Sequence, residues 1–255
     1  RRFSRSLAAL TILLPLLSGC AAGTRPVAEP EPPADPEVAA AIADESFRKA
    51  TALSRDGRIA DAAPWFERAA RHGHVDAQVM LGTMYLVGRG VGKDPAAAAE
   101  WYGVAAEAGD PWAQFSLGNM YLEGNGVPRD VREGIRLERL AAEQGHQGAQ
   151  YNLGALYYNG EAVARDYATA ANWFERAARQ GDTRSQLTLG RIYSTPHNGV
   201  PLDRVRAHAW LSLAAAGGNE EARTLADRLR RGMSAAERAS SRSMVRSLAQ
   251  DLPSR

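Results

Sequence analysis

Apolar and polar residues alternate with the period of an α-helix through most of this chain. The segment 75–87 has apolar residues at i, i+4, i+7 and i+8, the spacing that places side chains on one helix face. These residues are Ala77, Leu81, Met84 and Tyr85. The pattern predicts a helix over 75–87 with one buried face.

Glycine, aspartate and proline residues predict a second helix directly after the first. Gly88 and Gly90 end the first helix, because glycine tolerates the positive φ of helix ends and turns. Asp94 is a good N-cap, and Pro95 fits the first position of a new helix. The next stop signal is Gly109. We therefore expect a helix-turn-helix unit of two antiparallel helices.

This unit recurs at a spacing of 36 residues. The marks of the first helix are Ala77-Gln78, Ala113-Gln114, Ala149-Gln150 and Ser185-Gln186, then Leu81-Gly82, Leu117-Gly118, Leu153-Gly154 and Leu189-Gly190. The marks of the second are Asp94, Asp130, Asp166 and Asp203, then Trp101, Leu137, Trp173 and Trp210. One extra residue in the loop 194–199 makes the last step 37. Repeats of this length predict an all-α fold, an α-solenoid of stacked helix pairs.

Four glycines lie inside the predicted first helices, where no turn needs them. They are Gly82, Gly118, Gly154 and Gly190. Each costs roughly 1 kcal/mol of helix propensity relative to alanine. We expect a neighbouring helix to approach closely at these positions, which also accounts for alanine pairs such as Ala105-Ala106.

The repeated pattern resembles the Sel-one-like repeat family, which is related to the tetratricopeptide repeat. The matching elements are Ala-Gln-x-x-Leu-Gly-x-x-Tyr, Gly-x-Gly-Val-x-x-Asp, Ala-x-x-Trp and Ala-Ala-x-x-Gly, and they cover about residues 58 to 222. The resemblance implies a tetratricopeptide-like superhelix that serves as a non-enzymatic scaffold for protein–protein interaction. Departures are Ala162 in place of the second loop glycine, Leu137 in place of tryptophan, and Pro196 in the fourth loop.

The N-terminal segment has the features of a secretory signal. Three arginines precede an apolar stretch from Leu7 to Leu17, which is too short for a transmembrane helix. Leu17-Ser18-Gly19-Cys20 resembles the lipobox of bacterial lipoproteins, in which the cysteine becomes lipidated. Ala21 is not the aspartate associated with inner-membrane retention, so the resemblance implies an outer-membrane anchor facing the periplasm. The alternative is a signal cleaved nearby, with Cys20 as a bystander.

Together these features divide the chain into five parts. We expect a lipoprotein signal peptide over 1–19, a proline-rich tether over 20–36 and an N-terminal tetratricopeptide-like helical pair over 37–72. Sel-one-like repeats follow over 73–222, and C-terminal capping helices over 223–255. In the last part, Ser234 and Glu237 have the spacing of a capping box at the start of a terminal helix.

Charge and cysteine content exclude several classes of protein. Without the three arginines of the signal, 28 basic residues face 29 acidic ones. A nearly neutral protein lacks the broad positive field that nucleic acids require, so we expect no nucleic-acid partner. The single cysteine rules out an intramolecular disulfide and a thiolate zinc cluster.

Candidate catalytic and metal-binding residues are few. Ser46 and Lys49 match the Ser-x-x-Lys pattern of serine β-lactamases, but the companion motifs are absent. An envelope enzyme, β-lactamase-like or peptidoglycan-acting, is the alternative function. His72 and His74 flank Gly73 without a third ligand at a recognisable spacing, which favours a polar turn over a metal site. We predict no catalytic residue, metal or cofactor.

By analogy with tetratricopeptide repeats, the first helices line the concave face, where partners bind. The predicted partner-binding residues are Asp76, Thr83, Trp112, Phe115, Asn119, Tyr151, Tyr158, Arg184 and Arg191. Aromatic and arginine side chains often dominate interface energetics. Alternatively, Phe115 and Tyr151 pack between repeats. Expected partners are envelope proteins or peptides, with peptidoglycan or polysaccharide as a further possibility, and the membrane through lipidated Cys20.

Overall fold

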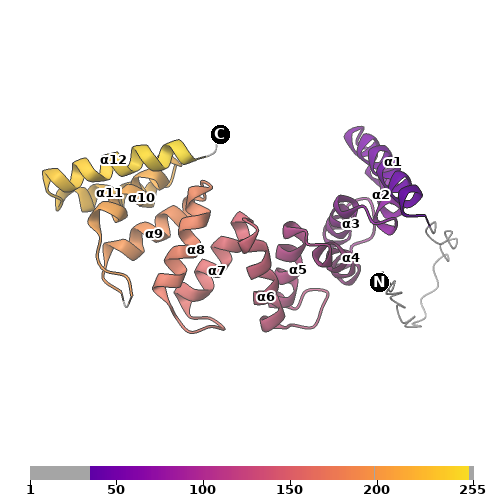
Figure 1. Ribbon diagram of the computed structural model, residues 1–255, viewed down its shortest axis with the longest axis horizontal. Coiled ribbons are helices and arrows are strands. Elements are labelled where there is room, and N and C mark those ends of the chain that lie inside the picture. The colour runs from indigo at the N-terminus through magenta and orange to yellow at the C-terminus, as the bar shows by residue number, and fades with distance from the viewer. Residues whose placement is uncertain (1–34, 198, 253–255) are drawn as a thin grey trace, which may run out of the picture. The chain divides into compact units, whose positions relative to one another are not determined.

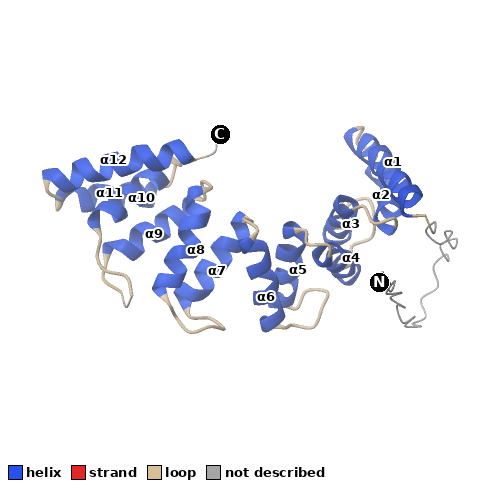
Figure 2. Cartoon of the chain, viewed as in Figure 1, coloured by secondary structure: helices blue, strands red, loops and turns tan. Residues whose placement is uncertain are grey.

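The computed structural model describes residues 35–197 and 199–252, and these residues form an all-α solenoid (Figures 1 and 2). The helices are α1 (Pro36–Arg55), α2 (Ile59–Arg71), α3 (Val75–Val87), α4 (Pro95–Glu107), α5 (Pro111–Glu123), α6 (Val131–Glu143), α7 (Gln147–Asn159), α8 (Tyr167–Arg179), α9 (Thr183–Ser194), α10 (Arg204–Ala216), α11 (Glu220–Arg231) and α12 (Ala235–Asp251). The predicted signal peptide, Cys20 and nearly all of the predicted tether lie outside the described residues.

Helices that follow one another in the chain pack against one another from α1 to α11. The odd-numbered helices α3, α5, α7 and α9 are the first helices of the repeats, and α4, α6, α8 and α10 are the second helices. The last helix, α12, packs back against α10 (Figure 1). The solenoid predicted from the 36-residue spacing is confirmed.

The predicted helix ends are confirmed in the repeat that begins at residue 75. Gly88 ends α3 in a left-handed conformation with φ of 74°, and its N–H donates to the carbonyl of Met84. Asp94 caps α4, where its Oδ1 accepts from the N–H groups of Ala96 and Ala97 at 3.0 and 3.1 Å. The capping aspartate satisfies backbone donors that would otherwise lack partners in the first turn.

One backbone hydrogen bond closes the loop between the two helices of every repeat. The N–H of the capping aspartate donates to the carbonyl of the repeated tyrosine, in the pairs Asp94–Tyr85, Asp130–Tyr121, Asp166–Tyr157 and Asp203–Tyr193. The fourth loop keeps this bond despite its additional residue. Within this loop, the N–H of His197 donates to the carbonyl of Val200, and the N–H of Val200 donates to the carbonyl of His197.

Ala162 occupies the loop position that is glycine in the two preceding repeats. Its φ is +63°, close to the +80° of Gly90 and the +76° of Gly126. Alanine adopts this region at a cost of roughly 1–2 kcal/mol. The loop therefore keeps its left-handed residue even where the sequence departs from the repeat pattern.

The close helix approach predicted at the intrahelical glycines is confirmed. A Cβ on Gly82 would lie 2.9 Å from the ring of Tyr102, and one on Gly154 would lie 2.7 Å from the ring of Phe174. A side chain at these positions would displace a buried ring. The loss of helix propensity at each glycine is thus offset by packing between the two helices of a repeat.

The C-terminal end of the solenoid is covered by α12. The predicted capping box is confirmed, because the Ser234 side chain accepts from the Glu237 N–H while the Glu237 side chain accepts from the Ser234 N–H. The boundary expected after residue 222 falls inside α11. That helix begins at Glu220, since the side chain of Asn219 accepts from the N–H of Ala222.

Within the residues that the structure describes, no helix is both long enough and apolar enough to cross a bilayer.

Candidate functional site

The repeats expose one face of each first helix. Successive residues turn by about 100°, so the second, fifth, sixth, ninth and twelfth residues of α3, α5, α7 and α9 point away from the buried positions. We call this surface the first-helix face. Its residues include Asp76, Val79, Met80, Thr83, Trp112, Phe115, Ser116, Asn119, Tyr151, Asn152, Ala155, Tyr158, Arg184, Leu187, Thr188 and Arg191. All nine predicted partner-binding residues lie on it.

Three rings form a cluster where α5 meets α7. The rings of Phe115 and His146 lie 4.4 Å apart at 30°, and Trp112 lies edge-on to His146 at 5.4 Å. The Nδ1 atom of His146 accepts from the N–H of Ala149 and so caps α7. Burial lowers the pKa of His146, although the Asp110 carboxylate acts in the opposite direction. A neutral imidazole fits this arrangement, because only an unprotonated Nδ1 can accept the capping bond.

His72 and His74, the two histidines considered as metal ligands, lie at the junction of α2 and α3, where His74 has a capping role similar to that of His146. His74 caps α3 through Nδ1 and stacks on Phe47 at 4.0 Å. The Nδ1 atom of His72 lies 2.8 Å from the carbonyl of Arg68. Both rings are therefore engaged at a helix junction. The described residues contain no group of three or more His, Cys, Asp or Glu side chains that could hold a metal ion.

The tyrosines of α7 pack between helices while keeping part of their surface exposed. The ring of Tyr151 lies 5.7 Å from that of Phe174, and the guanidinium of Arg184 covers it at 4.0 Å. Tyr158 meets Tyr167 edge-on at 5.4 Å. Phe115, Tyr151 and Tyr158 are all half-buried. These rings contribute to packing between helices, and their remaining surface belongs to the first-helix face.

Three of the predicted polar residues differ in whether their side chains contact other residues of the protein. Thr83 shares a hydrogen bond of 2.9 Å with the hydroxyl of Tyr102, which holds it against α4. Arg191 pairs with Glu221 across two repeats. Asp76 is exposed in the first turn of α3.

Asn119 belongs to a polar network that ends on a fully buried carboxyl group. Its Oδ1 accepts from Asn152 Nδ2 at 3.3 Å, and the same Nδ2 donates to Glu138 Oε1 at 2.8 Å. Glu138 is 0% exposed, and its Oε2 is buried without a hydrogen-bond partner. Burial raises the pKa of Glu138 from 4.5 to about 8, although the Asn152 hydrogen bond acts in the opposite direction. Asn152 also lines a small pocket of about 180 Å³ between α5 and α7.

Glu138 was missed by the sequence analysis. The 36-residue spacing places it at the repeat position that is apolar or aromatic elsewhere, namely Phe66, Tyr102, Phe174 and Leu211. All four of these side chains are buried. The alignment of the repeats contains the signal, since one carboxylic acid stands among four apolar or aromatic residues.

The Ser-x-x-Lys match lies in α1, where Ser46 is only 2% exposed. The Nζ atom of Lys49 lies 3.7 Å from the centre of the Trp65 ring, in a cation–π contact. A nucleophilic serine must be reachable by a substrate and activated by a base. Because Ser46 is buried and Lys49 contacts the Trp65 ring, this pair does not form such a site.

Comparison with known proteins gives consistent results for the repeats. The sequence model described as "Sel1 repeat" matches residues 59–74, 75–110, 113–146, 148–182 and 183–219. No curated protein matches the chain, and no enzyme family is indicated.

Two solved structures share both sequence and fold with this chain. One is c5321, a protective antigen of uropathogenic Escherichia coli strains that displays an SLR fold. It is 30% identical with a TM-score of 0.65, and the match covers 85% of this chain and 46% of that chain. The other is a Sel1 repeat protein from Oxalobacter formigenes, 38% identical with a TM-score of 0.63 over 66% of this chain and 49% of that chain. The matched regions span about half the length of each solved protein.

Proposed function

Because the chain belongs to the Sel1 repeat family, we propose that it is a non-enzymatic scaffold that binds other proteins through the first-helix face. Proteins built from these repeats are typically interaction scaffolds. A stacked array presents the same helix face again in every repeat, which provides an extended surface for a partner.

The exposed indole of Trp112 is the observation that carries this proposal. Its side chain is 53% exposed, although Phe115 and His146 hold one side of the ring. Met80 of the preceding repeat is 42% exposed on the same face. Tryptophan is strongly enriched among the residues that dominate binding energy, and a ring already held by neighbours loses little entropy when a partner covers it.

Trp112→Ala is expected to weaken partner binding by roughly tenfold or more, because a dominant interface residue contributes about 2 kcal/mol or more. The measurement is affinity capture from solubilised cell envelopes, with quantification of each captured protein by mass spectrometry. Val104→Ala is the matched control, since Val104 is 47% exposed on the second helix α4. Equal capture by the two variants would reject this surface.

The same capture distinguishes protein ligands from polysaccharide ligands. Protease treatment of the envelope extract before capture destroys a protein ligand and leaves peptidoglycan or another glycan intact. We expect the Trp112-dependent signal to disappear after protease treatment.

We also propose that the protein is anchored in the outer membrane through lipidated Cys20 and faces the periplasm. The support is the Leu17-Ser18-Gly19-Cys20 motif followed by Ala21. Cys20→Ser is expected to abolish incorporation of radiolabelled palmitate and to release the protein from the outer-membrane fraction, because no other cysteine can be lipidated. Labelling that persists in the variant, or an unmodified protein found in the inner membrane, would contradict this anchor.

A further inference from the structure

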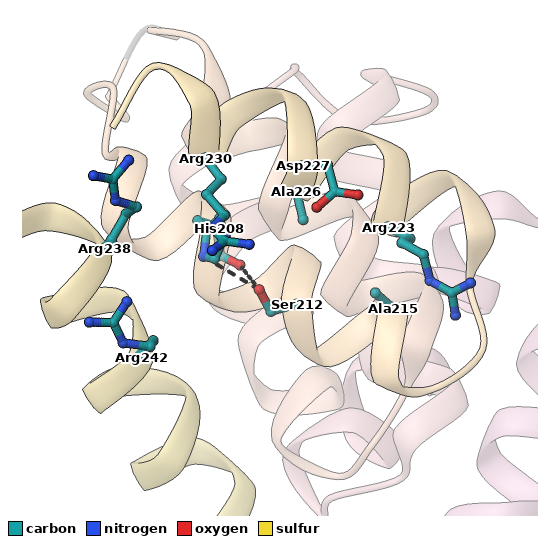
Figure 3. Close-up of a pocket in the computed structure, with 9 residues that line it drawn as sticks. All are labelled: His208, Ser212, Ala215, Arg223, Ala226, Asp227, Arg230, Arg238 and Arg242. Atoms are coloured by element: carbon teal, nitrogen blue, oxygen red, sulfur yellow. Dashed lines mark hydrogen bonds between the residues drawn. The ribbon is translucent and has the colours of Figure 1, made fainter. Parts of the chain in front are cut away.

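A pocket of about 360 Å³ lies between α10, α11 and α12. Its walls combine arginines and small apolar side chains around one histidine (Figure 3). The lining residues are His208, Ser212, Ala215, Arg223, Ala226, Asp227, Arg230, Arg238 and Arg242. The volume falls at the lower end of the range for small-molecule sites, about 300–1,000 Å³.

Helix periodicity brings the arginines together from two helices. Arg223 and Arg230 are seven residues apart on α11, and Arg238 and Arg242 are four apart on α12, so each pair occupies one helix face. Figure 3 shows the Arg230 side chain extending toward His208, while Arg238 and Arg242 lie across from them on α12. Four guanidinium groups and the carboxylate of Asp227 give the lining a net charge of +3 with His208 neutral.

Most of this charge has no partner within the described part of the chain. Arg223 pairs with Glu220 at 2.9 Å. The structure shows no side-chain hydrogen bond or ion pair for Arg230, Arg238 or Arg242 among the residues it describes. Like charges gathered around one pocket repel one another, and a bound anion would offset this repulsion.

His208 forms the neutral part of the lining. Its Nδ1 lies 2.8 Å from the hydroxyl of Ser241, which is completely buried. Burial lowers the pKa of His208, and the nearby Arg230 lowers it further, while Asp227 raises it. The hydrogen bond to Ser241 holds the ring in position on the side of the pocket where Arg230 lies.

We propose that this pocket binds a phosphate monoester group. A phosphate monoester carries between about −1.5 and −2 charges at pH 7 and three acceptor oxygens, which suit several planar guanidinium forks. With Glu220 paired to Arg223, the charge left at the pocket is +2, of which a single carboxylate would neutralise only one. Ala215 and Ala226 offer an apolar wall for the carbon skeleton attached to the phosphate.

Calorimetric titration of the full chain tests the proposal and separates two sources of this group. The probes are glycerol 3-phosphate, a soluble phosphate monoester, and dihexanoyl phosphatidic acid below its micellar concentration. Saturable binding of either supports the site. Comparable affinities indicate a free phosphorylated molecule, whereas tighter binding of the short-chain lipid indicates a lipid headgroup. Dihexanoyl phosphatidylcholine, a neutral phosphodiester, is the negative control.

A pair of charge-matched variants distinguishes a site from general attraction. The double substitution Arg230→Gln with Arg242→Gln is expected to weaken binding by roughly tenfold or more, since charge-assisted hydrogen bonds are lost. Arg228→Gln with Arg231→Gln removes the same charge from exposed positions of α11 outside the pocket and should bind as the unmodified protein does. Equal loss in both double variants, or no saturable binding of either probe, would overturn the proposal. Circular dichroism verifies that each variant is folded.

Discussion

Replacing Glu138 with glutamine is expected to raise the free energy of unfolding at pH 9 by up to about 5 kcal/mol, and by less than about 1 kcal/mol at pH 5. Glutamine has nearly the same shape and keeps an oxygen that can accept from Asn152. The substitution therefore removes the ionisable group while preserving the network.

The direction follows from the raised pKa of Glu138. Between the ordinary pKa of 4.5 and the folded-state pKa of about 8, the folded protein holds a proton that the unfolded chain has released. The free energy of unfolding then falls as pH rises through this window. Glutamine cannot ionise, so the variant does not lose this stability. The lowered pKa of His146 has the opposite effect below about 6.5, but it is common to both proteins and cancels in their difference.

Urea unfolding at pH 5 and pH 9 measures this effect, together with amide hydrogen exchange in α6. Glu143→Gln is the control, because Glu143 is exposed on the same helix and its removal should change stability little at either pH. If the gain in the free energy of unfolding for Glu138→Gln were equal at both pH values, or absent at pH 9, the pKa of Glu138 would not be raised by burial.

Trp210→Ala is expected to destabilise the protein by about 3–5 kcal/mol, whereas Trp173→Ala should cost roughly 1–2 kcal/mol. The two residues occupy the same repeat position, but Trp210 is 1% exposed and Trp173 is half-buried. Trp210 packs in one apolar cluster with Leu248 of α12. At Trp173 the guanidinium of Arg176 covers the ring at 4.6 Å.

The comparison tests whether α12 completes the core at the end of the solenoid. Thermal and urea unfolding of both variants measure how much stability each substitution removes. Amide hydrogen exchange in α12 shows whether that helix is the part destabilised. We expect the amides of α12 to lose protection from exchange in Trp210→Ala and to keep it in Trp173→Ala. Equal costs with α12 still protected would mean that the helix contributes little to covering the last repeat.

The sequence allows the helices, their caps and their stacking to be predicted because each depends on local residues repeated four times. Asp94 caps a helix through its own neighbours, and Gly154 signals a close contact because a glycine within a helix otherwise has a cost. The position of α12 follows from its capping box, but its burial of Trp210 required the structure, since tertiary contacts decide which tryptophan is covered.

Two features of chemical interest were not predicted from sequence, for different reasons. Glu138 lies among the charged residues of α6, where a glutamate is typical of an exposed helix face; only alignment with Phe174 and its equivalents distinguishes it. The arginine pocket depends on how α11 and α12 face each other, which no local pattern specifies. The nine residues predicted to bind partners share one face. The sequence left open whether Phe115 and Tyr151 bind a partner or pack between repeats, and the structure shows both rings packed against neighbouring helices with part of their surface exposed.

Photocrosslinking in cells shows whether partners bind the first-helix face. A photoreactive residue is placed at Asp76, Ser116 or Arg184 on that face, which leaves Trp112 intact, and at Val104, Leu140 or Arg176 on the second helices. We predict that the first three positions give crosslinks to the same partner protein and that the second three give none. Crosslinks of equal yield from both sets, or from the second helices alone, would contradict the claim.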